Sequence, residues 1–97
     1  SSNGQNIYPE EIEATCNNEA HVIESVVVDR KETLVALVYM DKDKLQADGI
    51  DLETRLAEIK VAVNKNMPSY SKLAKVEQVA EPFEKTPKMS IKRFLYN

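Results

Sequence analysis

The sequence predicts a small α+β domain in which a β-hairpin and a third strand form a short sheet flanked by helices, in the order α-β-β-α-β-α. Two apolar runs around a short polar stretch indicate the hairpin, and apolar residues at helical spacing indicate the central helix. The length of 97 residues allows one domain with a modest core. With 42% hydrophobic and 30% charged residues, the composition is that of a packed fold rather than a disordered or fibrous chain.

The first helix is expected to begin at Pro9, because a proline at the first helical position loses no intrahelical hydrogen bond. Two glutamates follow at the positive end of the helix dipole. Ile12 and Cys16 lie four residues apart on one face, and two asparagines from Asn17 end the segment. We therefore interpret Cys16 as a small buried apolar residue rather than a reactive thiol.

The β-rich runs at residues 26–28 and 34–39 predict the hairpin, with the polar stretch 29–33 as its turn. Neither run alternates cleanly between apolar and polar residues, which predicts burial on both faces of the sheet. His21 stands just before the first run, without a Ser, Cys or second His at a recognisable spacing. We interpret it as a structural histidine.

The charged stretch 40–49 is expected to be a solvated loop. Its aspartates do not follow the spacing of a calcium-binding EF-hand, because Leu45 and Gln46 stand where a ligand and a glycine are needed. The aspartates concerned are Asp41, Asp43 and Asp48.

Asp51 is the expected N-cap of the central helix, and Met67-Pro68 closes it. One apolar stripe runs along this helix at spacings of four, three and four, formed by Leu52, Leu56, Ile59 and Val63. Residues 75–80 read as the third strand. Two prolines make residues 81–87 irregular, and residues 90–96 are expected to form a short final helix with Ser90 as its N-cap.

Charge is distributed unevenly. Residues 1–70 hold 7 basic and 13 acidic groups, a net −6, and residues 71–97 hold 6 basic and 3 acidic groups, a net +3. A basic end on an acidic body indicates an anionic partner, unless these lysines are ordinary surface residues. We expect no nucleic-acid binding, which usually requires a more basic domain with interleaved aromatic residues.

Several classes of protein are excluded by composition. One Cys allows no internal disulfide framework, and one Cys with one His allows no multi-cysteine or multi-histidine zinc site. No apolar run approaches a membrane span, and no signal peptide is recognised. A cytoplasmic location is expected.

Two segments are not explained by packing. In residues 4–13, Gly4 before a helix lets a backbone approach a ligand closely. Residues 84–93 are basic and stiffened by proline, which suits them to present ammonium groups to a phosphate.

Together these segments resemble the C-terminal domain of AMP-forming acyl-CoA synthetases, part of the adenylate-forming ligases that include luciferases and nonribosomal-peptide adenylation domains. The closing segment is similar to the family pattern P-K-T-x-x-G-K-[IVL]-x-R, and its wording looks most like bacterial long-chain fatty acid–CoA ligases. The opening segment is similar to G-x-N-[IV]-x-P-x-E-[IV]-E through Gly4, Asn6, Ile7, Pro9, Glu11, Ile12 and Glu13.

The resemblance implies that residues 1–97 are a mobile lid whose large N-terminal domain, which binds ATP, Mg²⁺ and the acyl chain, is absent. The lid would first close over the fatty acyl-adenylate and then present a loop to CoA for thioester formation. The implied partners are the lid's own N-terminal adenylation domain, the acyl-adenylate and CoA, with peripheral membrane association of the parent protein as a further possibility. The isolated fragment is expected to be inactive.

The resemblance also assigns residues. The loop presented to CoA corresponds to Gly4, Gln5, Asn6 and Ile7. Lys72 and Lys75 are assigned to the phosphates of CoA by their charge alone.

The closing segment departs from the family at its catalytic lysine, because Met89 falls on the pattern's glycine and Ser90 on its lysine. Serine cannot supply an ammonium group, so Lys92 is the first candidate substitute and Lys88 the second. Otherwise adenylation relies on the N-terminal domain alone, or the ligase is weak or inactive. The alternative function is a stand-alone module that binds an anionic ligand through its basic C-terminal face.

Overall fold

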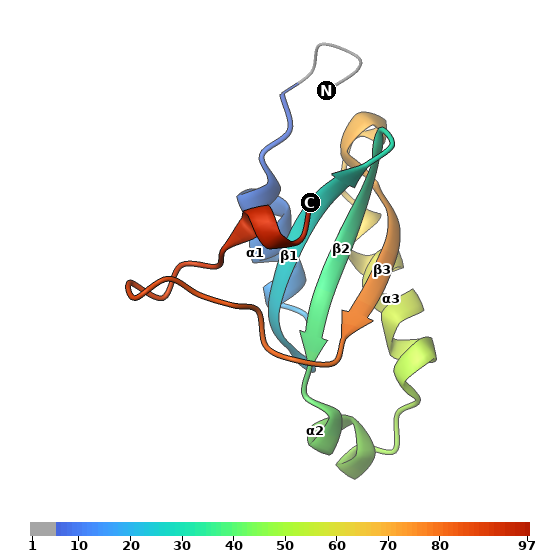
Figure 1. Cartoon of the computed structure of the whole chain (residues 1–97). Coiled ribbons are helices and arrows are strands. Elements are labelled where there is room, and N and C mark those ends of the chain that lie inside the picture. The colour runs from blue at the N-terminus through green and yellow to red at the C-terminus, as the bar shows by residue number, and fades with distance from the viewer. Residues whose placement is uncertain (1–5) are drawn as a thin grey trace.

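The structure, a computed structural model, describes residues 6–97 and is built around a three-stranded sheet in the order β1-β2-β3 (Figure 1). Strand β1 (Val22–Arg30) pairs antiparallel with β2 (Thr33–Met40), which pairs parallel with β3 (Leu73–Val79). The predicted α+β class and the predicted element order are confirmed.

The predicted hairpin connects β1 and β2 through a two-residue turn at Lys31 and Glu32. Both residues have positive φ, 51° and 67°, as a type I′ turn requires. Asp29 supports the turn, because its Oδ1 accepts a hydrogen bond of 3.1 Å from the Glu32 amide.

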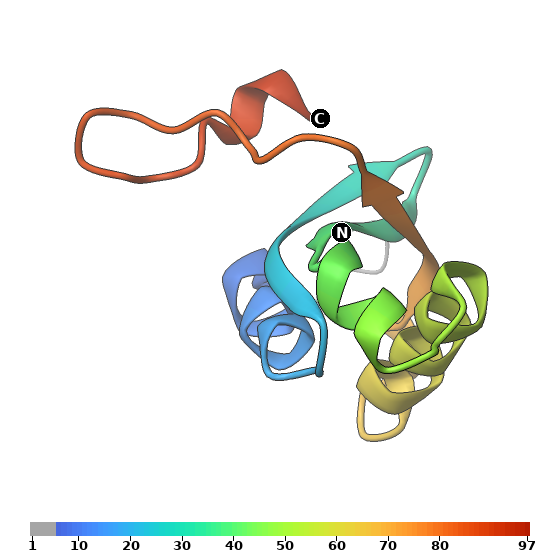
Figure 2. The same cartoon turned by 90° about the horizontal axis from the view of Figure 1, so that it is seen from below.

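Helices α1 (Pro9–Asn17) and α3 (Leu52–Asn64) cover one face of the sheet (Figures 1 and 2). The Asp51 side chain caps α3 by accepting a 3.0 Å bond from the Thr54 amide, as predicted. Ile59 and Cys16 are fully buried between these helices and the sheet. The burial confirms the interpretation of Cys16 and, with the nearby Glu13 carboxylate, raises the pKa of its thiol to about 12.

The opposite face of the sheet is covered by the irregular segment after β3. Phe83 from this segment packs on Val26 and Leu37. Tyr96 stands edge-on against Phe83, with ring centroids 5.0 Å apart. The strands are therefore buried on both faces, which agrees with their lack of alternation.

The prediction of a loop at residues 40–49 is wrong in part, because Lys42–Ala47 form a short helix, α2. The Asp41 side chain caps it by accepting a 3.0 Å bond from the Lys44 amide, and the buried Leu45 attaches it to the core. The central helix also ends earlier than expected, at Asn64, and a 3₁₀ turn, η1 (Ser69–Ser71), precedes β3.

The final helix expected over residues 90–96 is shorter than predicted and of a different type. Only a 3₁₀ turn, η2 (Arg93–Leu95), forms there, with Lys92 rather than Ser90 at its N-cap position. The backbone before it is extended, because Ile91 forms an antiparallel bridge with Lys85. The third strand lies two residues earlier at its start than expected, from Leu73.

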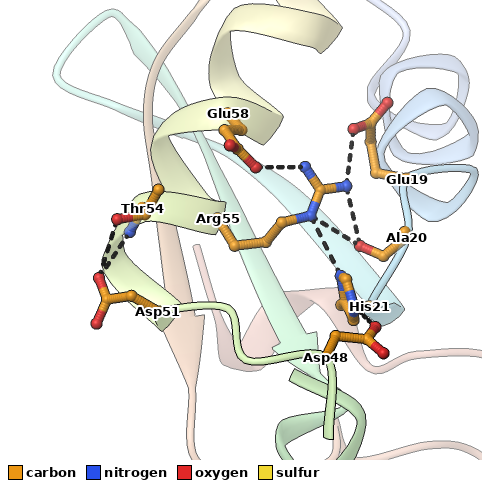
Figure 3. A network of polar contacts seen from close by, with 8 residues as sticks. All are labelled: Glu19, Ala20, His21, Asp48, Asp51, Thr54, Arg55 and Glu58. Atoms are coloured by element: carbon orange, nitrogen blue, oxygen red, sulfur yellow. Dashed lines mark hydrogen bonds and ion pairs between the residues drawn. The ribbon is translucent and has the colours of Figure 1, made fainter. Parts of the chain in front are cut away.

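His21 is held in a polar network at the start of β1 (Figure 3). Arg55 Nε donates a 3.3 Å bond to His21 Nδ1, so the ring's proton lies on Nε2, which donates to Asp48 Oδ2 at 2.7 Å. This hydrogen bond lowers the pKa of Asp48. With both ring nitrogens engaged, the interpretation of His21 as structural is confirmed.

Within residues 6–97, none of the helices combines the length and the apolar character that a membrane span requires.

Candidate functional site

The closing segment forms a small hairpin that projects from the body of the domain (Figures 1 and 2). Its two sides are joined by a 2.9 Å bond from the Lys92 amide to the Glu84 carbonyl and a 2.8 Å bond from the Thr86 amide to the Ser90 carbonyl. At the tip the Met89 amide donates to the Thr86 carbonyl at 2.8 Å. We call residues 84–92 the closing hairpin.

Met89 has a φ of 66°, in the left-handed region that favours glycine. The family pattern places its glycine at this position, so the backbone supports the register in which Ser90 stands at the lysine position. Ser90 is exposed, and its amide donates to Thr86 Oγ1 at 3.2 Å. The hairpin thus has, at the position before Ser90, the backbone conformation that a glycine would favour.

Lys85 anchors the first side of the closing hairpin. Its Nζ lies 2.9 and 3.1 Å from the two carboxylate oxygens of Glu24 on β1, and 3.0 Å from the Phe83 carbonyl. Glu24 Oε2 also accepts a 3.0 Å bond from the Phe83 amide. Lys85 therefore holds the chain and is not available to a phosphate.

Arg93 anchors the other side. Its guanidinium forms a two-pronged pair with Glu13 of α1, with Nη1 donating to Oε2 at 2.7 Å and Nη2 to Oε1. Glu13 Oε2 also accepts a 2.7 Å bond from the Val27 amide of β1. The hydrogen bond to Glu13 raises the pKa of Arg93. Sequence reasoning missed this pair, although each family pattern ends in one of its two opposite charges.

The two candidate lysines lie at different places on the closing hairpin. Lys88 is exposed near the tip, whereas Lys92 is half-buried and its backbone is fixed to Glu84. Neither of their ammonium groups pairs with a carboxylate within residues 6–97. Either is therefore free to meet an anionic ligand.

A groove lies beside the start of α1, where the loop assigned to CoA ends. Gly4 and Gln5 are outside the described residues, but Asn6 and Ile7 both border the groove. It measures about 380 Å³. The remaining lining residues are Tyr8, Glu11, Ile12, Thr15, Met67, Pro68, Tyr70 and Ser71.

The two lysines assigned to CoA differ in their surroundings. Lys72 is exposed and directly follows Ser71, which lines the groove. Lys75 is exposed on β3, and its Nζ pairs with Glu77 Oε1 at 3.1 Å. Of the two lysines, Lys72 is therefore the one whose neighbour in sequence lines the groove.

The family comparison finds a match over residues 1–96 to the AMP-binding enzyme C-terminal domain. The chain belongs to this family. The resemblance drawn from the two motifs is thereby confirmed. The comparison of this chain with curated proteins finds no match.

Solved structures share the fold of this AMP-binding enzyme C-terminal domain. An acyl-CoA synthetase of Brucella canis is 28% identical, with a TM-score of 0.72 over 95% of this chain and 17% of its own. A fatty acyl CoA synthetase of Mycobacterium tuberculosis is 21% identical, with a TM-score of 0.66 over 95% and 17%. A benzoate CoA ligase of Burkholderia xenovorans is 21% identical, with a TM-score of 0.71 over 95% and 18%. The domain thus spans less than a fifth of each of these chains.

The resemblance implies that Mg²⁺ accompanies ATP, and the domain's own side chains can be compared with the ligands that this ion requires. Mg²⁺ in proteins is held by carboxylates together with water and phosphate oxygens. Within residues 6–97, no group of three or more His, Cys, Asp or Glu side chains is placed to hold a metal ion. The residues described here therefore do not fit a dedicated Mg²⁺ cage.

Proposed function

We propose that this domain is the C-terminal lid of an AMP-forming long-chain fatty acid–CoA ligase, working with an N-terminal adenylation domain that binds ATP and the acyl chain. The family match over residues 1–96 carries this proposal. The closing hairpin supports it, because Met89 retains the backbone conformation of the pattern's glycine. We also propose a cytoplasmic location and, for the parent protein, peripheral contact with membranes.

In the first half-reaction, a fatty acid carboxylate attacks the α-phosphorus of ATP. An oxygen–phosphorus bond forms, the bond to pyrophosphate breaks, and negative charge develops on the phosphate oxygens. A positioned ammonium group stabilises such charge more in the transition state than in the ground state. We assign this role to Lys92.

Lys92 is preferred to Lys88 because of where the anchors lie. Both lysines are two residues from Ser90, about 6–7 Å along an extended chain, which the flexible four-carbon stem of a lysine can span, so reach does not separate them. Lys92 directly precedes the anchored Arg93, whereas Lys88 is exposed at the tip. A group held in place stabilises a transition state better than one that must be ordered during the reaction.

In the second half-reaction, the sulfur of CoA attacks the acyl carbonyl and AMP leaves with the electron pair of the broken bond. We propose that residues 4–7 guide the pantetheine arm to the adenylate. The groove supports this assignment, since Tyr8 and Tyr70 expose aromatic surface there and Lys72 follows it. Lys75 contributes less, because Glu77 already neutralises it.

The proposed preference for long acyl chains rests on the amino-acid sequence of the closing segment. The solved relatives include both a fatty acyl CoA synthetase and a benzoate CoA ligase. The carboxylic acid substrate is therefore to be identified by measuring ligase activity with different acids.

The test measures pyrophosphate release by the full-length protein with ATP and either palmitate or benzoate. Release with palmitate supports the proposal, and release with benzoate alone moves the substrate class to aryl acids. Lys92→Ala should lower the rate about 10²-fold and Lys88→Ala should have little effect. If no acid supports release, the ligase proposal fails, and binding of CoA by the unreactive protein would then favour the anion-binding alternative.

A further inference from the structure

We infer that Glu13 is a positioning residue for adenylation, because through Arg93 it fixes the Lys92 side of the closing hairpin to α1. This inference rests on the proposed function. It assigns a role to a buried carboxylate whose hydrogen-bond partners are the Val27 amide and the Arg93 guanidinium, and it predicts that the two half-reactions can be separated by mutation.

The Glu13 carboxylate joins three parts of the fold. It projects from α1, accepts a 2.7 Å bond from the Val27 amide on β1, and receives both prongs of the Arg93 guanidinium. The residue is only 6% exposed. A two-pronged arginine–carboxylate pair restricts rotation of the guanidinium as well as its distance. Arg93 is therefore held in one orientation relative to both α1 and the sheet.

The position of this pair along the chain gives it a functional consequence. Arg93 directly follows Lys92, so fixing its side chain limits where the Lys92 backbone can lie. Glu13 lies on α1, one helical turn after Pro9, where the loop assigned to CoA joins the helix. One carboxylate thus sets the spatial relation between the groups proposed for the two half-reactions.

The Lys85 side of the closing hairpin has its own anchor. Lys85 is held by Glu24 and by the Phe83 carbonyl, without any contribution from Glu13. The tip is closed by bonds between Thr86 and the residues up to Ser90. Removing the Arg93 guanidinium should therefore loosen the Lys92 side, which then keeps only its bonds to the Lys85 side, while the tip and the Lys85 side keep their shape.

Helix α1, which follows the loop assigned to CoA, is held to the sheet by contacts other than the pair. Helix α1 is attached to the sheet by the buried side chains of Ile12 and Cys16. Asn17 of α1 also accepts a 2.8 Å bond from the Ser25 hydroxyl of β1. Loss of Arg93 should therefore leave the CoA-directed half-reaction largely intact.

The experiment uses the full-length ligase with Arg93→Ala and measures each half-reaction. Pyrophosphate release with ATP and palmitate in the absence of CoA reports adenylation, and conversion of preformed palmitoyl-adenylate by CoA reports thioester formation. Adenylation kcat should fall roughly 10- to 100-fold, since small misplacements of a reacting group cost up to about 10²-fold, while thioester formation changes by less than about threefold. Arg93→Lys, which keeps the charge but not the fork, should recover part of the loss.

Arg55→Ala is the matched control. Arg55 is also a largely buried arginine, paired with Glu19, but its contacts are with the His21 network and not with the closing hairpin. It should lower stability without changing the ratio of the two half-reaction rates. If Arg93→Ala lowers both rates together, as a general loss of folding would, or lowers neither, the inference is overturned.

Hydrogen exchange gives a readout that does not require activity. The Lys92 amide is bonded to the Glu84 carbonyl at 2.9 Å, and the Met89 amide to Thr86 at the tip. Arg93→Ala should accelerate exchange at Lys92 but not at Met89. Unchanged protection of the Lys92 amide would overturn the inference even in a protein without measurable turnover. A wild type that adenylates no acid would contradict the proposed function, and the role in adenylation with it, but not the anchoring of the Lys92 side that hydrogen exchange measures.

Discussion

The ammonium group of Lys85 lies 2.9 Å from the nearer carboxylate oxygen of Glu24, on a strand that precedes it by 61 residues. Lys85 is the lysine of the Lys-Thr pair in the closing segment. Its ammonium group binds Glu24 and the Phe83 carbonyl and so fixes the first side of the closing hairpin to β1. The pair is mostly shielded from water, with side chains 24% and 15% exposed. Its loss should therefore cost more than that of a surface ion pair.

Lys85→Met keeps most of the apolar stem of the side chain and removes its charge. Breaking the pair leaves the Glu24 carboxylate partly buried without its cation, so the free energy of unfolding should fall by about 1–2 kcal/mol. Urea denaturation measures this change. Lys88→Met provides the control at an exposed, unpaired lysine of the same hairpin, and an equal loss in both variants would contradict the role given to Glu24.

Met89→Gly should stabilise the domain by about 0.5–1 kcal/mol. A residue with a Cβ pays about 1–2 kcal/mol at a positive φ, and the greater freedom of glycine in the unfolded chain cancels part of the gain. Met89 is 73% exposed, so little packing is lost. Thermal unfolding compares it with Met89→Ala, which retains the Cβ and should show no gain; stabilisation by both variants would mean that the backbone strain is not the cause.

Ser90→Lys should restore adenylation to a full-length ligase already carrying Lys92→Ala. The backbone places residue 90 where the family pattern has its lysine, so the new ammonium group should recover much of a loss of about 10²-fold. Pyrophosphate release measures the recovery. Ser90→Met supplies a long side chain without charge and should not rescue; a rescue by methionine would show that bulk rather than charge is missing.

Asp48 should contribute a pH-dependent part of the stability. The hydrogen bond from His21 lowers the pKa of Asp48 from 3.8, the ordinary value for the unfolded chain. A carboxyl whose pKa is lower in the folded state stabilises the fold fully above the unfolded value, and that stabilisation is lost as the pH falls through the folded value. The effect is therefore present at neutral pH and begins to be lost as the pH falls below about 4.

Asp48→Asn removes this dependence and should flatten the acid side of a plot of unfolding free energy against pH. Asp43→Asn, at an exposed aspartate in the first turn of α2, is the control for the removal of a nearby carboxylate that does not contact His21. An unaltered acid side in Asp48→Asn would show that the bond to His21 does not persist in solution.

The elements predicted correctly from sequence are those whose signal is local. The stripe through Leu56 and Ile59 and the Asp51 cap lie within a few residues of one another, and the periodicity of a 13-residue helix is visible in the sequence. Helix α2 was missed because its six residues bury a single side chain, Leu45, which shows no periodicity.

The final segment and the hairpin anchors could not be predicted in this way. Arg93 and Glu13 are 80 residues apart, and no local pattern shows that the fold brings them together. The predicted helix over residues 90–96 gives way to extended chain because Ile91 pairs with Lys85 and packs on the sheet. The family resemblance identified the functional segments but not the contacts that fix them.

The sheet face covered by Phe83 and Tyr96 has a consequence for how the protein is made. All three strands leave the ribosome before these aromatic side chains, so the cluster around Val26 and Leu37 is complete only after synthesis has passed residue 96. An uncovered apolar sheet face is prone to aggregation while it lasts. The nascent chain therefore exposes this face of the sheet at a stage when its helices are already able to pack on the other face.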